Sequence, residues 1–262
     1  MPFKNIGAIY SPKNLPKYHW TRDPVDTRDQ PYQLVSLPTT PATVDLRNYC
    51  SAIEDQGALG SCTGNAIASA IELIDRKNSK NLEISRLFIY YQERLLEGTV
   101  YYDSGAYIRD GIKACYTYGA PLESIWPYNL KKWAVKPTAA AYSDAKTRKV
   151  TGYKKCADFA AVKNALAAGT PVIIGFDVYD SFESDAVAAT GMMPYPNTAT
   201  EQLLGGHAVC IVGYRDSDQR FIVRNSWGTG WGDKGYFYMP YSVIQNASMS
   251  SDFWTISAVK NP

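Results

Sequence analysis

Apolar residues recur at helical spacing in the first half of the chain. Between positions 66 and 74 they are three or four residues apart, which places them on one face of an amphipathic helix that begins near Cys62. The same spacing predicts helices over residues 85–96 and 108–118, and Gly119 is typical of the position just past a helix C-terminus. We therefore expect a mostly helical lobe over about residues 50–150.

The second half is richer in strand-like runs. Asp158 is a typical N-cap for a helix that continues through Ala168 and ends at Gly169. Runs of β-branched and aromatic residues then predict strands at residues 171–174, 207–214, 221–223 and 235–239. Residues 181–204, rich in Ala, Thr, Asn and Pro, are expected to form a long surface loop. A helical lobe followed by a β lobe, over about residues 151–256, is an α+β arrangement.

The first 40 residues differ from the rest of the chain. They contain six of the fifteen prolines and show neither helical nor strand periodicity. We interpret residues 1–40 as an extended arm and residues 41–262 as the folded domain. The first residues contain no apolar stretch, so no signal peptide is expected, and both a cytoplasmic protein and one secreted by a non-standard route are compatible with this start.

Composition narrows the classes of function. Hydrophobic residues make up 45% and charged residues 20% of the chain, close to the average of globular proteins. The net charge is +2 and there are no basic runs, so we expect no nucleic-acid partner. No stretch approaches eighteen consecutive apolar residues, so we expect no membrane partner either.

Cysteines and histidines are few enough to restrict the chemistry. The five cysteines, at positions 50, 62, 115, 156 and 210, show no CxxC spacing, which disfavours a zinc site and a dense disulfide framework. An odd number leaves at least one free thiol, and outside position 62 we expect packing or disulfide roles without assigning pairs. Only His19 and His207 are available to a mechanism that needs an imidazole. His19 lies in the proline-rich arm and is expected to be incidental.

One segment combines a nucleophile with a favourable backbone environment. The small residues that follow Gln56 form a turn into the first helix, so Cys62 lies at the helix N-terminus, where unpaired N–H groups and the positive end of the helix dipole favour a thiolate. His207 follows two glycines and opens an apolar strand. Asn225 comes just after the strand at 221–223, so its amide can orient the imidazole if the two strands are neighbours.

These segments resemble the papain family of cysteine peptidases, which includes the cathepsins. Cys62 and His207 are about 145 residues apart, within the spacing of roughly 130 to 150 residues typical of the family. A third motif is the run Asn225-Ser226-Trp227-Gly228-Thr229-Gly230-Trp231-Gly232. The resemblance extends from Val44 to the C-terminus and implies a two-lobe fold, with a helical lobe, an antiparallel β-barrel-like lobe and the active-site cleft between them. The short non-helical arm is similar to the layout of a bacterial branch.

The resemblance also implies roles for individual residues. Cys62 and His207 would form a thiolate–imidazolium pair, Asn225 would hold the ring, and Gln56 would donate a hydrogen bond to the oxyanion. Trp227 would shield the bond between His207 and Asn225 from water, whereas Trp231 is expected to be a core aromatic residue. The implied substrate-binding residues are Gly105, Ala106, Ile108, Gly175, Gly206, Ala208 and Trp227.

The pocket for the second residue before the scissile bond would have its floor between positions 252 and 255. Its small wall residues favour a bulky apolar or aromatic side chain, and Asp252 would favour a basic one if it points inward.

Three positions depart from the family pattern. Leu59 replaces a cysteine of a family disulfide, so cysteine usage does not indicate secretion. Thr63 replaces an aromatic residue, and Ala106 replaces the second glycine of a pair that bonds the substrate backbone.

The implied function is that of a cysteine-type endopeptidase, a monomer that hydrolyses peptides or proteins through an acyl-enzyme without a metal or organic cofactor. Two alternatives stay open. One is an exopeptidase, in which the arm or residues 181–204 close one end of the cleft. The other is a non-catalytic peptide-binding relative, which would normally have lost Cys62, His207 or Gln56.

We expect the arm to lie across or beside the cleft and regulate access, as in a zymogen. The alternative is a loosely attached extension.

Overall fold

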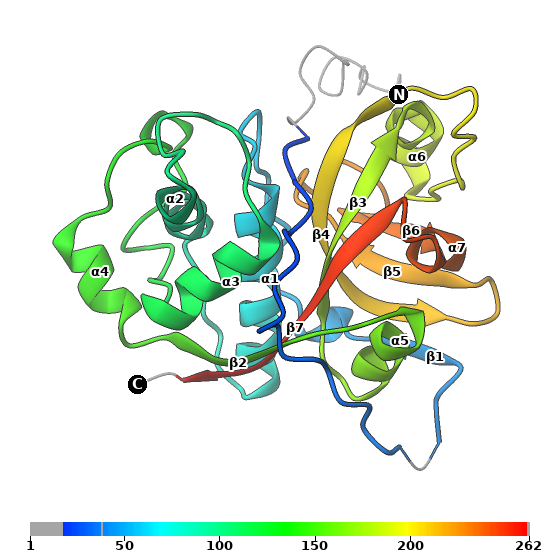
Figure 1. Ribbon diagram of the computed structural model, residues 1–262, viewed down its shortest axis with the longest axis horizontal. Helices are drawn as coiled ribbons and strands as arrows, with labels where there is room; N and C mark the ends of the chain where they lie inside the picture. Colours follow the sequence, from blue (N-terminus) through cyan, green and yellow to red (C-terminus); the bar gives the residue numbers. More distant parts are fainter. Residues whose placement is uncertain (1–17, 38, 261–262) are drawn as a thin grey trace, which may run out of the picture.

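Four helices form one side of the molecule in the computed structural model, which describes residues 18–37 and 39–260 (Figure 1). They are α1 (Cys62–Lys77), α2 (Arg86–Glu97), α3 (Ile108–Thr117) and α4 (Ala139–Ala145). α2 begins where the Ser85 hydroxyl accepts a hydrogen bond from the N–H of Phe88, and it ends at Gly98, whose φ of 72° glycine adopts without strain. The helices expected at 85–96 and 108–118 form within one residue of their predicted ends. The sequence pattern did not predict α4.

An antiparallel sheet of seven strands forms the other side (Figure 1). Its path is β2-β7-β3-β4-β5-β6, and β1 pairs with β4. The strands are β1 (Thr43–Asp45), β2 (Lys149–Lys155), β3 (Val172–Tyr179), β4 (Leu203–Arg215), β5 (Arg220–Arg224), β6 (Tyr236–Pro240) and β7 (Ser250–Lys260). The two-lobe α+β arrangement is as expected, with one correction. Within the described residues β2 and β6 are the ends of the path and do not pair, so the sheet is open and does not close into a barrel.

Four of these strands, β3 to β6, overlap the predicted ones, and β1, β2 and β7 were not predicted. β2 contains few apolar residues, so apolar and polar residues do not alternate clearly along it, and most of its side chains are half-buried. It is a strand because β7 pairs along it, with Lys155 opposite Trp254. Pairing between segments about 100 residues apart cannot be recognised from local periodicity.

Three shorter helices accompany the sheet in the described part of the chain. They are α5 (Phe159–Ala167), α6 (Asp185–Thr190) and α7 (Tyr241–Gln245), with 3-10 turns at Arg47–Tyr49, Leu130–Lys132 and Asp180–Glu183. The predicted cap of α5 is present, since Asp158 accepts a hydrogen bond of 2.9 Å from the N–H of Ala161. The loop expected at residues 181–204 is wrong in part. Ser184 caps α6 through a bond to the N–H of Val187, and the last residues of the segment already belong to β4.

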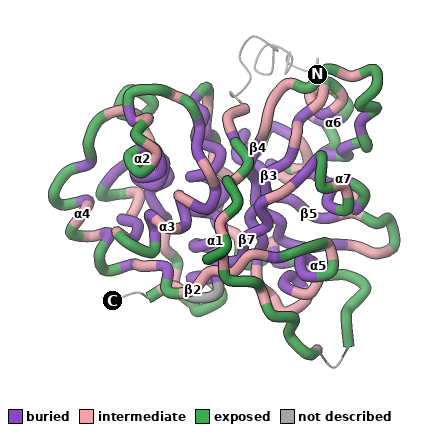
Figure 2. The backbone as a smooth tube through the Cα atoms, in the orientation of Figure 1, coloured by how far each residue is buried: buried purple, intermediate pink, exposed green. Residues whose placement is uncertain are grey.

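Helix α1 lies between the other helices and the sheet and is buried along nearly its whole length (Figure 2). Side chains of β3 alternate between two apolar clusters, as the pleat of a strand requires. Ile173 packs with Ile67 and Ile71 of α1 in one cluster, whereas Ile174 and Phe176 belong to the other cluster, with the apolar residues of α5 and α7. The sheet is therefore covered on both faces, and the N-terminus of α1 is fixed against it.

The five cysteines all lie within the described residues, and none of them forms a disulfide. Cys62, Cys115, Cys156 and Cys210 are buried and Cys50 is half-buried. Of the two roles expected for the cysteines outside position 62, packing is therefore the one observed.

The described part of the arm, residues 18–37, passes between the two sides of the molecule in an extended conformation (dark blue in Figure 1). Trp20 donates its backbone N–H to the carbonyl of Gly206 at 2.9 Å, and Tyr32 donates its N–H to the carbonyl of Lys155 at 2.8 Å. The bridges from His19 to Gly206 and from Trp20 to Ala106 are parallel. Residues 1–17 of the predicted arm lie outside the described residues.

Candidate active site

Cys62 is the first residue of α1, at the end of the turn that follows Gln56, and its side chain is fully buried. No acidic residue lies in the first turn of α1, so the positive end of the helix dipole is not neutralised from within the helix. The backbone N–H groups of Ala208, His19 and Thr63 are near enough to the thiol to lower its pKa, against the effect of burial. Because Ala208 follows His207 in β4, the strand that carries the imidazole lies against Cys62.

His207 and Asn225 are brought together by the pairing of β4 with β5. The Nε2 atom of His207 lies 2.9 Å from Oδ1 of Asn225, which also accepts the backbone N–H of Ser226 at 2.9 Å. Because Oδ1 of Asn225 is a hydrogen-bond acceptor, it binds Nε2 of His207 when that nitrogen carries the proton. The other ring nitrogen, Nδ1, is buried and has no hydrogen-bond partner among the residues of the described ranges.

Aromatic rings enclose the imidazole. Trp227 stacks on His207 with ring centroids 5.0 Å apart and an angle of 28° between the planes. Trp231 packs edge-on against Trp227 at 4.8 Å, and Phe182 contacts both indoles. The rings of Trp227 and Trp231 are therefore parts of one buried aromatic cluster, in which only Trp227 stacks directly on the histidine.

Gln56 is fully buried, and its side chain is held at both ends. Its Oε1 accepts a hydrogen bond of 2.6 Å from the Ser226 hydroxyl, and its Nε2 donates to the carbonyl of Leu59 at 2.9 Å. An amide nitrogen has two protons, so the bond to Leu59 leaves the second for another acceptor. Sequence reasoning did not identify Ser226, which fixes both Gln56 and Asn225, although it lies between two residues that were chosen.

Most of the predicted substrate-binding residues lie around Trp20 of the arm, which is only 5% exposed, whereas Trp227 lies against the ring of Tyr18. A Cβ atom on Gly175 would lie 1.9 Å from the Trp20 ring, and one on Gly206 would lie 2.6 Å from it, so glycine at both positions makes room for the indole. Ile108, Ala208 and Trp254 belong to the same apolar cluster as Trp20. Gly105, at a φ of 71°, lies against the His19 carbonyl, and Ala106 bridges to Trp20.

Two further arm residues lie next to the predicted catalytic groups. The ring of Tyr18 is edge-on to His207 at 5.8 Å and to Trp227 at 5.9 Å, and its hydroxyl donates to the carboxylate of Glu183. His19, whose imidazole was expected to be incidental, lies with its backbone near the thiol of Cys62, and the expectation for its imidazole stays a prediction. The sequence contains no local signal for this contact, which depends on where the arm crosses the domain.

Asp252, near the expected floor of the pocket, is buried and accepts the backbone N–H of Asp23 at 2.8 Å. Its carboxylate thus binds the main chain of the arm next to the aromatic pocket. The Asp23 carboxylate in turn accepts hydrogen bonds from the Trp254 indole at 2.7 Å and from the N–H of Arg109 at 3.2 Å. Burial, together with the charge of Asp252, raises the pKa of Asp23 to about 7.

The covered site favours uncharged forms of its two reactive groups. Burial raises the pKa of the Cys62 thiol to about 11, although the backbone N–H groups that reach the sulfur oppose this. Burial lowers the pKa of His207 to about 4, opposed by the bond to Asn225. Both shifts favour the neutral thiol and the neutral imidazole while the arm is in place.

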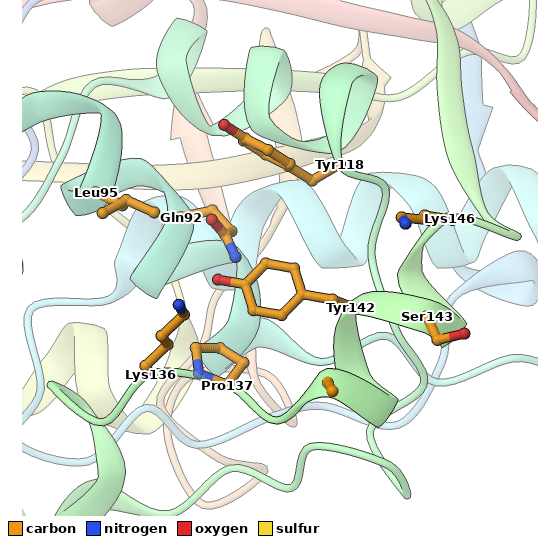
Figure 3. A pocket seen from close by; sticks show the side chains of 9 residues that line it. Gln92, Leu95, Tyr118, Lys136, Pro137, Tyr142, Ser143 and Lys146 are labelled. Atoms are coloured by element: carbon orange, nitrogen blue, oxygen red, sulfur yellow. The ribbon is translucent and has the colours of Figure 1, made fainter.

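A cavity of about 640 Å³ lies away from these residues, between α2, α4 and the segment before α4 (Figure 3). Gln92, Tyr118, Lys136 and Tyr142 are among its lining residues, and none of the predicted site residues is. The cleft at Cys62 is filled by the arm instead.

No group of three or more His, Cys, Asp or Glu side chains with the geometry of a metal site occurs in residues 18–37 and 39–260. Nor does this part of the chain contain a helix with the length and apolar character to cross a membrane.

Comparisons with known proteins agree with this arrangement. The sequence model of the papain family of cysteine proteases matches residues 40–255. The peptidase C1-like protein L477 of Acanthamoeba polyphaga mimivirus is 46% identical over 220 residues, which cover 79% of this chain and 70% of the viral protein. Cathepsin K of Gallus gallus is 29% identical over 220 residues, which cover 80% of this chain and 62% of that protein, so less than two thirds of it is matched.

A solved structure extends the likeness to three dimensions. Xylellain, a cysteine protease from Xylella fastidiosa, superposes with a TM-score of 0.85 at 38% identity, over 93% of this chain and 96% of that one. The relatives thus come from a virus, an animal and a bacterium, and the bacterial origin expected from the layout stays a prediction. With a family match over most of its length and a papain-like fold, the chain belongs to the papain family of cysteine proteases.

Proposed function

We propose that the chain is a cysteine endopeptidase in which Cys62 is the nucleophile and His207 is the proton carrier. One observation carries this proposal. Cys62 begins a helix and lies against the backbone of Ala208, the residue after His207, and the Nε2 atom of His207 is fixed 2.9 Å from Oδ1 of Asn225. With Nε2 engaged by Asn225, Nδ1 is the nitrogen available to exchange a proton with the thiol.

The reaction follows from these positions. The Cys62 thiolate attacks the peptide carbonyl carbon, a C–S bond forms, and the carbonyl oxygen takes the negative charge. His207 gives its proton to the leaving amine as the C–N bond breaks, and a thioester remains on Cys62. Water, deprotonated by His207, then attacks the thioester, which releases the carboxylic acid product and regenerates the thiolate.

Gln56 is proposed to stabilise the oxyanion together with the backbone N–H of Cys62. Support comes from its fixed amide, whose oxygen is held by Ser226 and whose nitrogen has one proton left after bonding Leu59. A donor fixed before the reaction begins needs no rearrangement when charge develops on the oxygen.

The chemistry is tested by replacing Cys62 with alanine and measuring hydrolysis of a fluorogenic peptide. We expect no turnover, with the melting temperature close to that of the wild type. Cys50→Ala is the matched control, because Cys50 is a half-buried free thiol outside the cleft, and it should keep its turnover. Substantial activity of the Cys62 variant would mean that another nucleophile is present. Asn225→Ala should weaken turnover without abolishing it.

We further propose that the arm inhibits the enzyme as long as it lies in the cleft. Trp20 fills the space between Gly175 and Gly206, and the backbone of His19 lies close enough to Cys62 to lower the pKa of its thiol. The arm therefore occupies the position that a substrate needs next to the thiol. A loosely attached extension would not bury an indole to 5% exposure.

The arm has a second, electrostatic effect in this proposal. Excluding water from Cys62 and His207 holds both neutral, with the thiol pKa near 11 and the imidazole pKa near 4. Displacement of the arm returns water to the cleft, which favours the thiolate–imidazolium pair. Release would thus unblock the substrate pocket and activate the nucleophile in one step.

Endopeptidase action is favoured over exopeptidase action by the course of the arm. A continuous polypeptide passes the thiol here, with Tyr18 next to His207 on one side and Trp20 on the other. A cleft that accepts chain on both sides of the nucleophile suits an internal peptide bond. Peptides blocked at both ends should therefore be cleaved, and cleavage restricted to peptides with a free terminus would favour the exopeptidase alternative.

A further inference from the structure

Arg22 of the arm occupies a site made by the catalytic domain. Its guanidinium donates to the carbonyl of Ala247 at 2.8 Å and to the carbonyl of Ser248 at 2.6 Å, and it pairs with a carboxylate oxygen of Asp177 at 3.3 Å. The domain thus offers three acceptors, one of them charged, to one side chain.

The acceptors are held by the domain itself. Asp177 belongs to β3, two residues after Gly175, and its backbone N–H bonds the carbonyl of Met249 at 2.8 Å. Asn246 fixes the turn that carries the two carbonyls, because its side chain accepts both the N–H and the hydroxyl of Ser248. These bonds do not involve the arm, so the site is available to another ligand when the arm leaves.

The chemistry of the site suits arginine better than lysine. A guanidinium is a planar fork with five N–H donors, which can reach two carbonyls and a carboxylate at once, whereas an ammonium is a compact point charge. The Arg22 guanidinium also lies 5.6 Å from the centre of the Trp20 ring, within the range of a cation–π contact. The aromatic pocket and the arginine site are therefore neighbours that one extended peptide can fill together.

We propose that Asp177 and the carbonyl oxygens of Ala247 and Ser248 form a guanidinium subsite that selects substrates with an arginine two residues from the aromatic residue bound between Gly175 and Gly206. The proposal rests on the peptidase function proposed above. It identifies as substrates peptides and proteins with this pair of side chains.

The order of the two residues follows from the direction of the chain. The proposal includes this direction: a substrate that places its carbonyl carbon at Cys62 and fills the same two sites runs opposite to the arm. Residues i and i+2 of an extended chain point to the same side in either direction. Because His19, the neighbour of Trp20, lies at the thiol, the expected sequence is arginine, any residue, an aromatic residue, any residue, and then the cut bond.

The test uses the full chain with Trp20→Ala and Arg22→Ala, which empties both sites. Four quenched fluorescent peptides contain Xaa-Ser-Trp-Gly before the cut bond, with arginine, citrulline, lysine or alanine as Xaa. Citrulline has nearly the shape of arginine without its charge. We expect kcat/KM for the arginine peptide to exceed that for the citrulline peptide about tenfold, and Asp177→Asn to reduce this ratio to within about twofold. Asp185→Asn, a matched change in α6, should leave the ratio at about tenfold.

Binding of the same peptides to the Cys62→Ala form of this variant provides a readout without catalysis. Tighter binding of the arginine peptide, by a similar factor, supports the subsite even if no peptide is cleaved, and that combination would count against the peptidase proposal alone. Equal binding of the arginine and citrulline peptides, binding of neither, or an unchanged ratio in Asp177→Asn would overturn the subsite and leave Arg22 as an anchor of the arm only.

Discussion

Replacing Trp20 with alanine should raise the basal turnover of the full chain by weakening the docked arm. The indole is 5% exposed in its pocket, and removing a buried Trp side chain typically costs about 3 to 5 kcal/mol. The lower end of this range applies to a segment at the surface, which can relax into the space. At about 1.4 kcal/mol per tenfold change, 3 kcal/mol increases the ratio of released to docked arm roughly 100-fold.

Two measurements on the same protein check this expectation. The first is the initial rate with a fluorogenic peptide, and the second is the rate of Cys62 alkylation by iodoacetamide, which reports access to the thiol without requiring catalysis. Both should increase together, up to the limit at which the arm is fully released. Val25→Ala is the matched control, since Val25 is an arm residue that is 97% exposed, and it should change neither rate. Unchanged turnover and alkylation in Trp20→Ala would refute the inhibitory role of the arm.

Three further predictions concern charge and the oxyanion. The pKa of Asp23 in the docked arm is about 7, above its ordinary value of 3.8, so Asp23 contributes fully to docking below about pH 4 and this contribution is lost as the pH rises through 7. Asp23→Asn should therefore lower turnover at pH 8 and match the wild type near pH 4. A ratio of variant to wild-type turnover that does not change with pH would contradict this. Glu93 accepts a hydrogen bond of 2.7 Å from the Thr63 hydroxyl, and burial raises the pKa of its carboxyl from 4.5 to about 8, so the stability of the fold should fall as the pH rises through 8. Glu93→Gln should reduce the change in melting temperature between pH 5 and pH 9. Parallel curves for the variant and the wild type would assign the pH dependence to other groups. Gln56→Met removes the amide donor without adding a charge and should lower kcat roughly 100- to 1000-fold, and a loss confined to KM would exclude an oxyanion role.

Local features of the chain were predictable to the extent that their causes are local. The helices at 85–96 and 108–118 follow from apolar spacing and capping residues, which act within a few positions. The turn before Cys62, which places the thiol at a helix N-terminus, is likewise predicted by consecutive small residues. In contrast, β2 and β7 form because distant segments pair, and α6 appeared within a stretch whose composition indicated a loop.

The fold class, the family and the residues proposed for the chemistry could be inferred from the chain alone, because three short motifs and two histidines leave few alternatives. What covers Cys62 is visible only in the folded molecule. The pocket of Trp20 is assembled from β3, β4 and the segment before α3, and the site of Arg22 from β3 and the turn before β7. Each of these segments is separated from the arm by many residues. Their contacts with the arm depend on how the folded lobes place them. No local pattern in a proline-rich segment predicts such contacts.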